Sequence, residues 1–229
     1  SQRDTGWIQY YAADAQDVLD AILIAYAVAE EALLPVMVNL DAFYLTHTSE
    51  LLDVPDQETV DLFLPPYQAP TKVDVHDPKT FSIVCGADLF SSIKYKRQID
   101  TLAVPRLWDQ TAERFNRHFN RLHKTVEAYR MEDAELCIIS IGTAAGTIRL
   151  AVDRLREEGL KIGSLRLAMI RPFPVEGLQQ ETARVKHVVV IDRDVSFGAE
   201  GIVAQEVKAA LFERRGDLKV TGFVAGVGG

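Results

Sequence analysis

Three segments of this sequence carry residue types that bind small ligands. Arg3 lies in the opening segment RDTGW, and a guanidinium can hold a carboxylate through two parallel hydrogen bonds. Residues 142–147 (GTAAGT) open a predicted helix, whose unpaired backbone amides and dipole can receive a phosphate. Asp192 and Asp194 stand in the loop DRDVSFGAEG, and carboxylate oxygens are cation ligands. The chemistry open to these residues is binding of a carboxylate, a phosphate or a metal.

Each segment can also have a purely structural role, and the residues by themselves favour that role over ligand binding. A single arginine near a chain end is ordinarily solvated. The glycines of 142–147 lack the spacing G-x-G-x-x-G, and Arg171 stands where a ribose-binding acid would follow the second strand. A tight strand-to-helix turn is therefore favoured there over a nucleotide site. Two acids without further oxygen ligands make a poor cation site, so a subunit-contact loop is favoured for 192–201, and no metal ligand is predicted.

The composition excludes several classes of protein. The 229 residues carry a formal net charge of −8, which argues against nucleic-acid binding because phosphates require a basic surface. No apolar run approaches the roughly 18 residues of a membrane helix, and from the opening residues we expect no export leader. The two cysteines, Cys85 and Cys137, cannot hold an iron–sulfur cluster unaided. We expect two free structural thiols, which fit a cytoplasmic protein.

The elements that would position the opening segment lie in residues 1–70. Residues 7–12 are a short apolar strand candidate. Residues 14–31 place apolar side chains at spacings of three and four, which predicts an amphipathic helix. Asp14 or Asp17 would cap this helix and suit its dipole.

A second strand in this block predicts where a ligand would lie. The near-continuous apolar run 34–40 is typical of a strand covered on both faces. It ends at Asp41, so the loop 41–48 should lie at the carboxyl end of a parallel strand. Open α/β sheets carry their ligands at that end.

Residues 71–133 are expected to form a connector with a long helix. Prolines without periodicity punctuate 53–110, which indicates loops that wrap a neighbour, apart from a short helix at 56–63. Residues 111–131 recover the helical spacing. One face of that helix is basic, and in an acidic protein a solvated face is favoured over an anion site. The basic residues are Arg114, Arg117, His118, Arg121 and Lys124.

Residues 134–229 alternate strands and helices, which predicts a parallel sheet with right-handed crossovers, a Rossmann-like domain. Gly159 suits the left-handed end of the first helix. The RPFP segment at 171–174 leaves its strand stiffly, because each proline forces the preceding residue to be extended, and we interpret it as a packing corner. The expected strands are 136–141, 164–170, 187–192 and 218–224, and the expected helices are 144–158, 175–185 and 201–214.

Taken in order, these motifs resemble a known family. RDTGW, LLPVMVNLDAFYLTHT and PDQETVDLFLPP in the first half, then GTAAGT, RPFP and DRDVSFGAEG, are similar to the alpha subunit of the 2-oxoacid:ferredoxin oxidoreductases, of the pyruvate:ferredoxin oxidoreductase (pyruvate synthase) type. The resemblance covers both ends of the chain and is weakest across 72–107. Any one motif is moderately specific, whereas the ordered set is strong.

The resemblance implies an α/β fold in three parts. Residues 1–70 would be part of the thiamine-diphosphate pyrimidine-side domain, 71–133 the connector, and 134–229 a transketolase C-terminal-like domain with a parallel sheet. The family's activating glutamate and its substrate-side threonine precede the position of Arg3. We therefore expect a fragment or a split subunit.

The resemblance also implies an activity that needs several chains. The family decarboxylates pyruvate or a related 2-oxoacid to acyl-CoA and CO2 and passes electrons to ferredoxin, or runs the reverse reaction. Thiamine diphosphate with Mg would sit mainly on a partner chain, and [4Fe-4S] clusters on partner chains. The expected partners are the other subunits, ferredoxin, coenzyme A and the 2-oxoacid, without nucleic acid or membrane.

For the site, the resemblance assigns a role to Arg3, which would contact the 2-oxoacid carboxylate. Asp41, Thr46 and His47 would lie near the cofactor cleft, although structural hydrogen bonding is favoured over catalysis for Asp41 and His47. No catalytic residue is predicted in this chain. Ala42 stands where the family has glycine, which puts a left-handed turn there in doubt.

Two alternatives stay open at the level of sequence. The chain could be a purely structural assembly subunit in which Arg3 is idle. It could also belong to a transketolase or 2-oxoacid dehydrogenase type of thiamine enzyme with another acceptor. The identity of the 2-oxoacid cannot be read from these residues.

Overall fold

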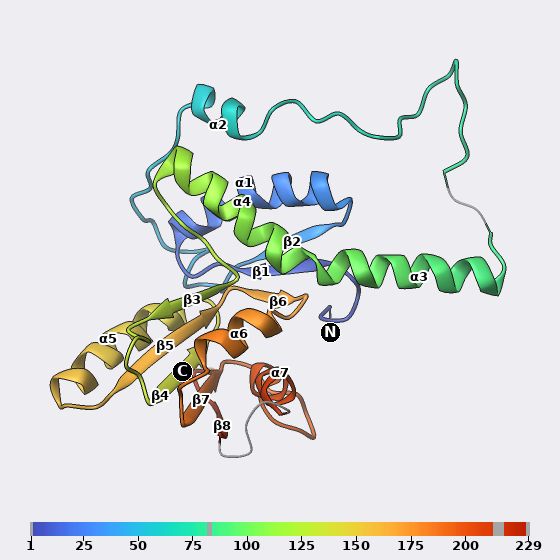
Figure 1. Ribbon diagram of the computed structural model, residues 1–229. Coiled ribbons are helices and arrows are strands. Elements are labelled where there is room, and N and C mark those ends of the chain that lie inside the picture. The colour runs from blue at the N-terminus through green and yellow to red at the C-terminus, as the bar shows by residue number, and fades with distance from the viewer. Residues whose placement is uncertain (1, 82–83, 213–217, 228–229) are drawn as a thin grey trace.

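Two sheets, one above the other in Figure 1, organise the protein. The computed structural model describes residues 2–81, 84–212 and 218–227. The upper sheet has the strand order β2-β1-β6 and the lower sheet the order β3-β5-β4-β7-β8. The strands are β1 (Ile8–Tyr11), β2 (Val36–Asn39), β3 (Val126–Tyr129), β4 (Leu136–Ser140), β5 (Ile162–Leu167), β6 (Met169–Arg171), β7 (His187–Asp192) and β8 (Lys219–Val224). The helices are α1 (Ala15–Ala32), α2 (Gln57–Phe63), α3 (Ala87–Leu102), α4 (Val104–Phe119), α5 (Ala144–Glu157), α6 (Val175–Glu181) and α7 (Ile202–Leu211).

The upper sheet is built around β1, which pairs in parallel with β2 and antiparallel with β6. Helix α1 follows β1 and is capped by Asp14, whose carboxylate accepts a hydrogen bond from the Asp17 amide at 2.8 Å. The second strand is predicted to be covered on both faces, and all four residues of β2 are half-buried. Val36 and Val38 pack against the core under α1, which covers one face. In the hydrogen-bonded order of the sheet, β2 is an edge strand.

Aromatic side chains from α2 and α4 complete the upper core. Trp108 and Phe115 of α4 are fully buried together with Phe63 of α2. The Trp108 ring stacks on Tyr10 of β1 with 4.5 Å between ring centroids, and Phe63 meets Phe115 edge to face at 5.3 Å. Such pairs add to the apolar burial that holds a helix on a sheet, so α4 is fixed over β1.

The connector differs from the prediction in its helices and in one added strand. Helix α3 was not predicted, and α4 begins at Val104, with Pro105 in its first turn, where a missing amide costs nothing. The helix expected across 111–131 stops at Phe119, because Asn120 adopts the left-handed conformation with φ of 53°. Strand β3 then replaces the predicted last helical turns. The short helix at 56–63 is confirmed as α2.

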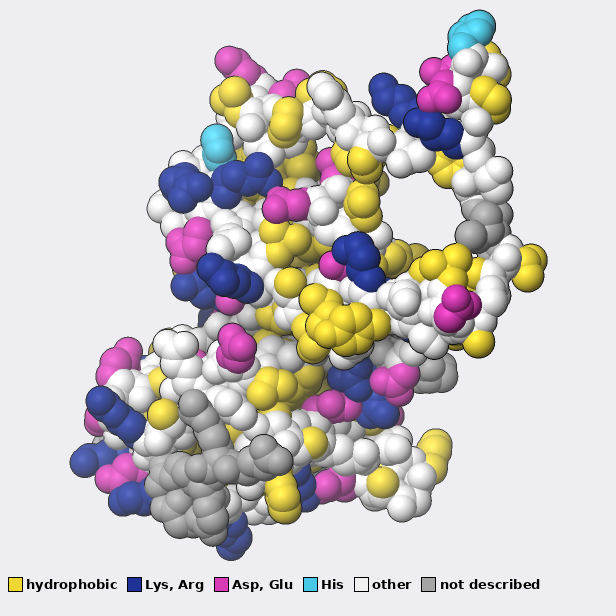
Figure 2. All heavy atoms as spheres, turned by 45° about the vertical axis from the view of Figure 1, so that its right-hand side comes forward, with side chains coloured by type: hydrophobic (Ala, Val, Ile, Leu, Met, Phe, Trp, Pro, Cys, Tyr) yellow, Lys and Arg dark blue, Asp and Glu magenta, His cyan; other side chains and the backbone are white. Residues whose placement is uncertain are grey.

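Helix α3 projects from the body of the molecule (Figure 1). Within the part of the chain that the structure describes, none of its residues is buried. In Figure 2 the segment 64–81 leaves the body, α3 returns to it, and an opening lies between them. Apolar side chains such as Phe90 and Tyr95 are exposed on α3. Among the described helices, none has both the length and the apolar character needed to cross a bilayer.

The lower sheet confirms the predicted parallel β–α alternation, with β4, β5, β7 and β8 parallel and β3 added antiparallel at the edge. Gly159 ends the α5 segment with φ of +91°, as predicted. The strand expected at 164–170 is not continuous. β5 stops at Leu167, and after Ala168 the chain crosses to the upper sheet, where β6 pairs with β1. The two sheets therefore share one stretch of backbone.

Candidate functional site

A cavity of about 390 Å³ lies where strands from both sheets end. One wall comes from the segment before β1, from β1 itself and from the end of β2, and the other from the ends of β4, β6 and β7 and the start of α7. This is the carboxyl edge at which open α/β sheets carry ligands. The lining residues are Gln2, Arg3, Gln9, Tyr11, Met37, Asn39, Asp41, Ile141, Ile170, Asp192, Arg193, Asp194, Ile202 and Val203.

Arg3 lines this cavity, and its guanidinium belongs to a cluster of four alternating charges. Arg3 Nη1 lies 3.2 Å from Glu206 Oε1 on α7, and Arg3 Nε lies 3.3 Å from Asp4. Arg171 of the RPFP segment contacts the same Glu206 oxygen at 2.7 Å and Asp4 at 3.2 Å. Because the Arg3 side chain keeps 35% of its surface exposed, its guanidinium stays accessible to an anion.

Asp41 also lines the cavity and joins its two walls. Its Oδ2 atom accepts hydrogen bonds from the Thr143 amide at 2.9 Å and from the Thr143 hydroxyl at 2.5 Å. Arg193 donates to the same oxygen at 3.2 Å and to Thr143 Oγ1 at 3.0 Å. Gly142 has φ of +59°, and a Cβ there would stand 2.8 Å from Asp41 Oδ2, so the turn requires glycine. As predicted, 142–147 opens with a tight turn, and the anion at the α5 N-terminus is Asp41.

Replacing Asp41 with asparagine is expected to lower the free energy of unfolding by about 1.5 kcal/mol, because a charge-assisted hydrogen bond to Arg193 becomes a neutral one. Chemical denaturation at neutral pH measures this loss. Asp194→Asn is the matched control, since exposed Asp194 lines the same cavity and its carboxylate accepts from the neighbouring Val195 amide. Equal losses in the two variants would contradict a bridging role for Asp41.

Both carboxylate oxygens of Asp192 accept hydrogen bonds from backbone amides. It is 2% exposed, and its two oxygens accept hydrogen bonds from the Val203 and Ala204 amides at 2.8 and 3.0 Å, which caps α7. Burial raises the pKa of Asp192 above its ordinary value, although these two amide bonds lower it. Across residues 2–81, 84–212 and 218–227, no three His, Cys, Asp or Glu side chains are grouped as metal ligands.

Thr46 and His47 lie outside the cavity lining, in an exposed loop after β2. Thr46 Oγ1 accepts from the Phe43 amide at 3.0 Å and lies 2.7 Å from His47 Nδ1. The Phe43 ring stacks on His47 at 4.7 Å. The left-handed residue in this loop is Phe43, with φ of 64°, and not Ala42, so the missing glycine imposes no strain at position 42.

Two family models together match most of the chain. Residues 1–113 match the thiamine-diphosphate-binding domain of pyruvate flavodoxin/ferredoxin oxidoreductases, and 134–229 match pyruvate:ferredoxin oxidoreductase core domain II. The chain belongs to the 2-oxoacid:ferredoxin oxidoreductase family. The resemblance read from the ordered motifs is thereby confirmed.

Curated relatives agree across the whole chain. Pyruvate synthase subunit PorA of Pyrococcus abyssi is 39% identical over 232 residues, and PorA of Thermotoga maritima is 39% identical over 236 residues. Ketoisovalerate oxidoreductase subunit VorA of Pyrococcus horikoshii is 36% identical over 234 residues. Each alignment covers 100% of this chain, which spans 59% of the length of each of these relatives.

A solved structure shares the fold. The 2-oxoglutarate:ferredoxin oxidoreductase from Magnetococcus marinus, with 2-oxoglutarate, coenzyme A and succinyl-CoA bound, superimposes with a TM-score of 0.60 at 18% identity. The match covers 95% of this chain and 38% of that one. The likeness supports the α/β architecture of this family member.

Several cavity residues were missed at the level of sequence. Gln9 and Tyr11 of β1 face the cavity, whereas Ile8 and Tyr10 belong to the upper core, as the two-residue period of a strand requires. Asn39, at the end of β2, donates to the Tyr10 carbonyl at 3.2 Å. Polar Gln9 and Asn39 within short apolar strands were the available signal.

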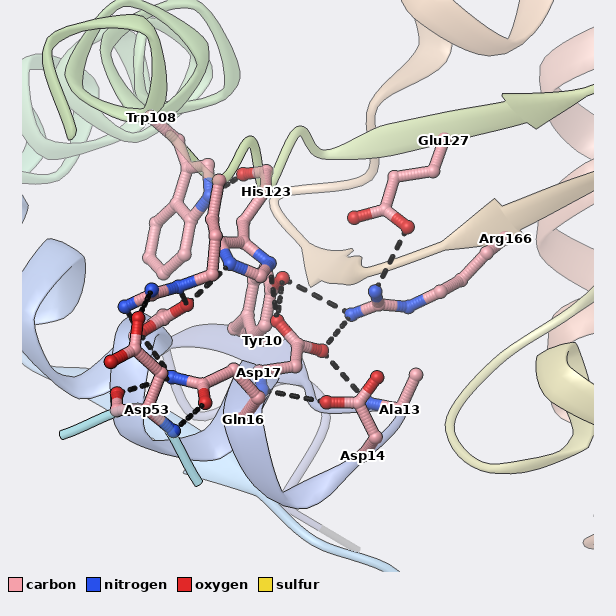
Figure 3. Close-up of polar contacts among 12 residues, drawn as sticks. Tyr10, Ala13, Asp14, Gln16, Asp17, Asp53, Trp108, His123, Glu127 and Arg166 are labelled. Carbon is pink, nitrogen blue, oxygen red and sulfur yellow. Dashed lines mark hydrogen bonds and ion pairs between the residues drawn. The ribbon is translucent and has the colours of Figure 1, made fainter. Parts of the chain in front are cut away.

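A buried network of charges lies on the opposite face of β1 (Figure 3). Arg166 of β5 bonds to Asp17 of α1, to the Tyr10 hydroxyl at 3.1 Å and to Glu127 of β3 at 3.0 Å. His123, between α4 and β3, lies 2.9 Å from Asp17. The network therefore ties α1 of the upper sheet to β5 and β3 of the lower sheet, and it fixes the two walls of the cavity.

Asp20 extends this network to the surface. It is fully buried, and it contacts His123 Nε2 at 2.9 Å and Arg121 Nε at 2.6 Å. Arg121 also reaches Asp53 at 2.6 Å. Arg121 is therefore not simply part of a solvated basic face, as its place in the predicted helix suggested, because the chain leaves the helix before it.

Proposed function

We propose that this chain is part of the alpha subunit of a thiamine-diphosphate-dependent 2-oxoacid:ferredoxin oxidoreductase. The reaction breaks the bond between the carboxylate and the carbonyl carbon, releases CO2, joins the acyl group to coenzyme A as a thioester and passes two electrons to ferredoxin. The reverse reaction is the same balance read backwards. The observation that carries the proposal is Arg3 on a cavity shared by the two matched domains.

Arg3 would bind the substrate carboxylate. A planar guanidinium matches a carboxylate better than any other side chain. Asp4 and Glu206 already hold this guanidinium, so a substrate must share or displace contacts that are partly exposed to water. We therefore expect a moderate contribution to binding. Pyruvate and branched-chain 2-oxoacids are both within the proposed range, since the relatives include pyruvate synthase and ketoisovalerate oxidoreductase subunits.

The residues of the cavity fit one side of a thiamine diphosphate site. When bound, the cofactor supplies the stabilised carbanion that decarboxylation needs. Asn39 and Asp41 would give the polar contacts of this chain. The helix termini that open on the cavity are already occupied, α5 by Asp41 and α7 by Asp192. We therefore propose that the diphosphate and its Mg bind mainly to a partner chain.

The remaining cofactors and partners are proposed on the same basis. Fe–S clusters need about four thiolates, whereas Cys85 and Cys137 are free and Cys137 is buried in β4, so [4Fe-4S] clusters would belong to partner chains. The proposed partners are the other subunits, ferredoxin and coenzyme A. Two free thiols fit the reducing cytoplasm, where we propose the complex works.

The test is Arg3→Met in the assembled complex. We expect kcat/KM for the preferred 2-oxoacid to fall about 30- to 100-fold, since a carboxylate–guanidinium pair that is partly screened contributes about 2 to 3 kcal/mol. Ferredoxin reduction dependent on 2-oxoacid and coenzyme A measures this loss. Lys208→Met is the control, because Lys208 lies on the same helix as Glu206 but pairs with Glu200. Unchanged kinetics in Arg3→Met would leave the structural-subunit alternative.

A further inference from the structure

We propose that Gln9 is a positioning residue for Arg3, which fixes the backbone of residues 2–3 so that the guanidinium faces the cavity. The proposal rests on the proposed function, because the consequence of this positioning is binding of the 2-oxoacid carboxylate. Gln9 would act through Arg3.

The contacts of Gln9 are specific to the segment that carries Arg3. Its Nε2 atom donates to the Gln2 carbonyl at 2.7 Å and to the Arg3 carbonyl at 3.3 Å. Gln9 itself is 4% exposed, and the two hydrogen bonds are partly buried. Removing the Gln9 amide would take from both carbonyls a donor that belongs to a buried strand residue. The amide therefore holds this backbone from the core side.

Gln9 is held in the upper sheet by strands on both sides. β1 is its central strand, and Gln9 is in register with Met37 of β2 on one side and Arg171 of β6 on the other. A side chain on a central strand is a better reference point than one on a loop. Because β1 pairs with β6, and β6 follows directly after β5, Gln9 is connected to both sheets. The position of Arg3 therefore depends on both sheets.

Other contacts close the segment into a turn from residues outside β1. The Thr5 hydroxyl donates to the Gln2 carbonyl at 2.8 Å, and Arg97 of α3 donates to the Gly6 carbonyl at 3.0 Å. Gly6 has φ of +86°, and a Cβ there would meet Arg97 Nη2 at 2.6 Å. These contacts shape the turn from outside, whereas Gln9 anchors it from the core.

The backbone and the head group of Arg3 are held from different elements. Gln9 fixes the backbone from β1, and Glu206 holds the guanidinium from α7. When the backbone anchor is removed, the guanidinium can follow Glu206 away from the cavity wall. Substrate binding should then weaken, while later steps that do not involve Arg3 continue at their former rate.

The experiment compares Gln9→Met, Arg3→Met and the double variant in the assembled complex. We expect Gln9→Met to raise KM for the 2-oxoacid about tenfold, with kcat and the KM for coenzyme A within twofold of the parent. In the Arg3→Met background the same change should add nothing, because a positioning residue has no effect once its target is gone. Gln9→Asn keeps an amide but is one methylene shorter, and it should shift KM in the same direction if Gln9→Met fails to assemble.

Gln179→Met is the matched control. Gln179 also donates its amide to a backbone carbonyl, that of Ala210 at 2.7 Å, but on α6 away from the cavity. Its KM for the 2-oxoacid should match the parent. An unchanged KM in both Gln9 variants, or an increase that is equal in the Arg3→Met background, would overturn the positioning role. If Arg3→Met itself leaves KM unchanged, the proposed carboxylate contact of Arg3 fails, and the positioning role fails with it. If Arg3→Met raises KM and neither Gln9 variant does, the positioning role alone is overturned.

Discussion

Replacing Arg166 with methionine is expected to lower the free energy of unfolding by about 4 kcal/mol, because it leaves buried carboxylates without their cation. Arg166 is 5% exposed and contacts Asp17, which is 1% exposed, and Glu127. Burial raises the pKa of Glu127, which the charge of Arg166 opposes, so without Arg166 that carboxyl group would tend to take up a proton. Chemical denaturation at neutral pH measures the loss.

Arg149→Met is the matched control for this prediction. Arg149 lies 3.4 Å from the same Glu127 oxygen, but 46% of its side chain is exposed. Exposed pairs contribute up to about 1 kcal/mol. A large difference between the two variants would show that burial, and not the ion pair as such, sets the cost. Losses of the same size would refute that account of the network.

The second large effect is a loss of stability at alkaline pH through His123. Burial by itself would lower the pKa of His123, but hydrogen bonds to Asp17 and Asp20 and their charges raise it to about 9. The stabilisation is complete below the unfolded-state value of 6.5 and is lost as pH rises through about 9. Arg121, Arg166 and Glu127 are the other charged groups of this network. The shift corresponds to about 3 kcal/mol.

Unfolding free energies between pH 6.5 and 10 test this expectation in the parent, in His123→Gln and in His47→Gln. The parent and His47→Gln, whose histidine is exposed, should lose stability in parallel, and His123→Gln should be flatter by about 3 kcal/mol. Burial raises the pKa of Asp17 and of Asp20, but their cationic partners lower both pKa values below the ordinary one. These partners are His123 and Arg166 for Asp17, and His123 and Arg121 for Asp20. The contribution of Asp17 and Asp20 is lost as pH falls through those lowered values. Parallel curves for all three proteins would contradict the role of His123.

The sequence allowed the fold class and most elements of 134–229 to be predicted, because those strands and helices have buried apolar faces with a clear period. Helix α3 was missed for the opposite reason. None of its residues packs into a described core, so its apolar side chains follow no stripe. The apolar spacing that runs from Phe115 through Val126 continues past the true end of α4, and the left-handed Asn120 that breaks it has no strong sequence signature.

The site was predictable only where one motif carried it. Arg3 and Asp41 line the cavity. In the sequence, Arg3 stood out because it lies in the RDTGW motif, and Asp41 because it follows a predicted strand. Gln9 was hidden inside a strand, and Arg193 was overlooked between two acids. The buried network joins partners that are up to 156 residues apart, as Tyr10 and Arg166 are, and no local pattern encodes such a pairing.

The passage of β6 into the upper sheet has a consequence for how the protein is made. During synthesis the first half leaves the ribosome early, yet β1 gains its second neighbour only when residues 169–171 have emerged. Until then β1 presents a bare strand edge, which invites pairing with other chains. We expect the nascent first half to need protection from aggregation through this edge. A cut between the two matched domains should yield an aggregation-prone fragment instead of two independently folded halves.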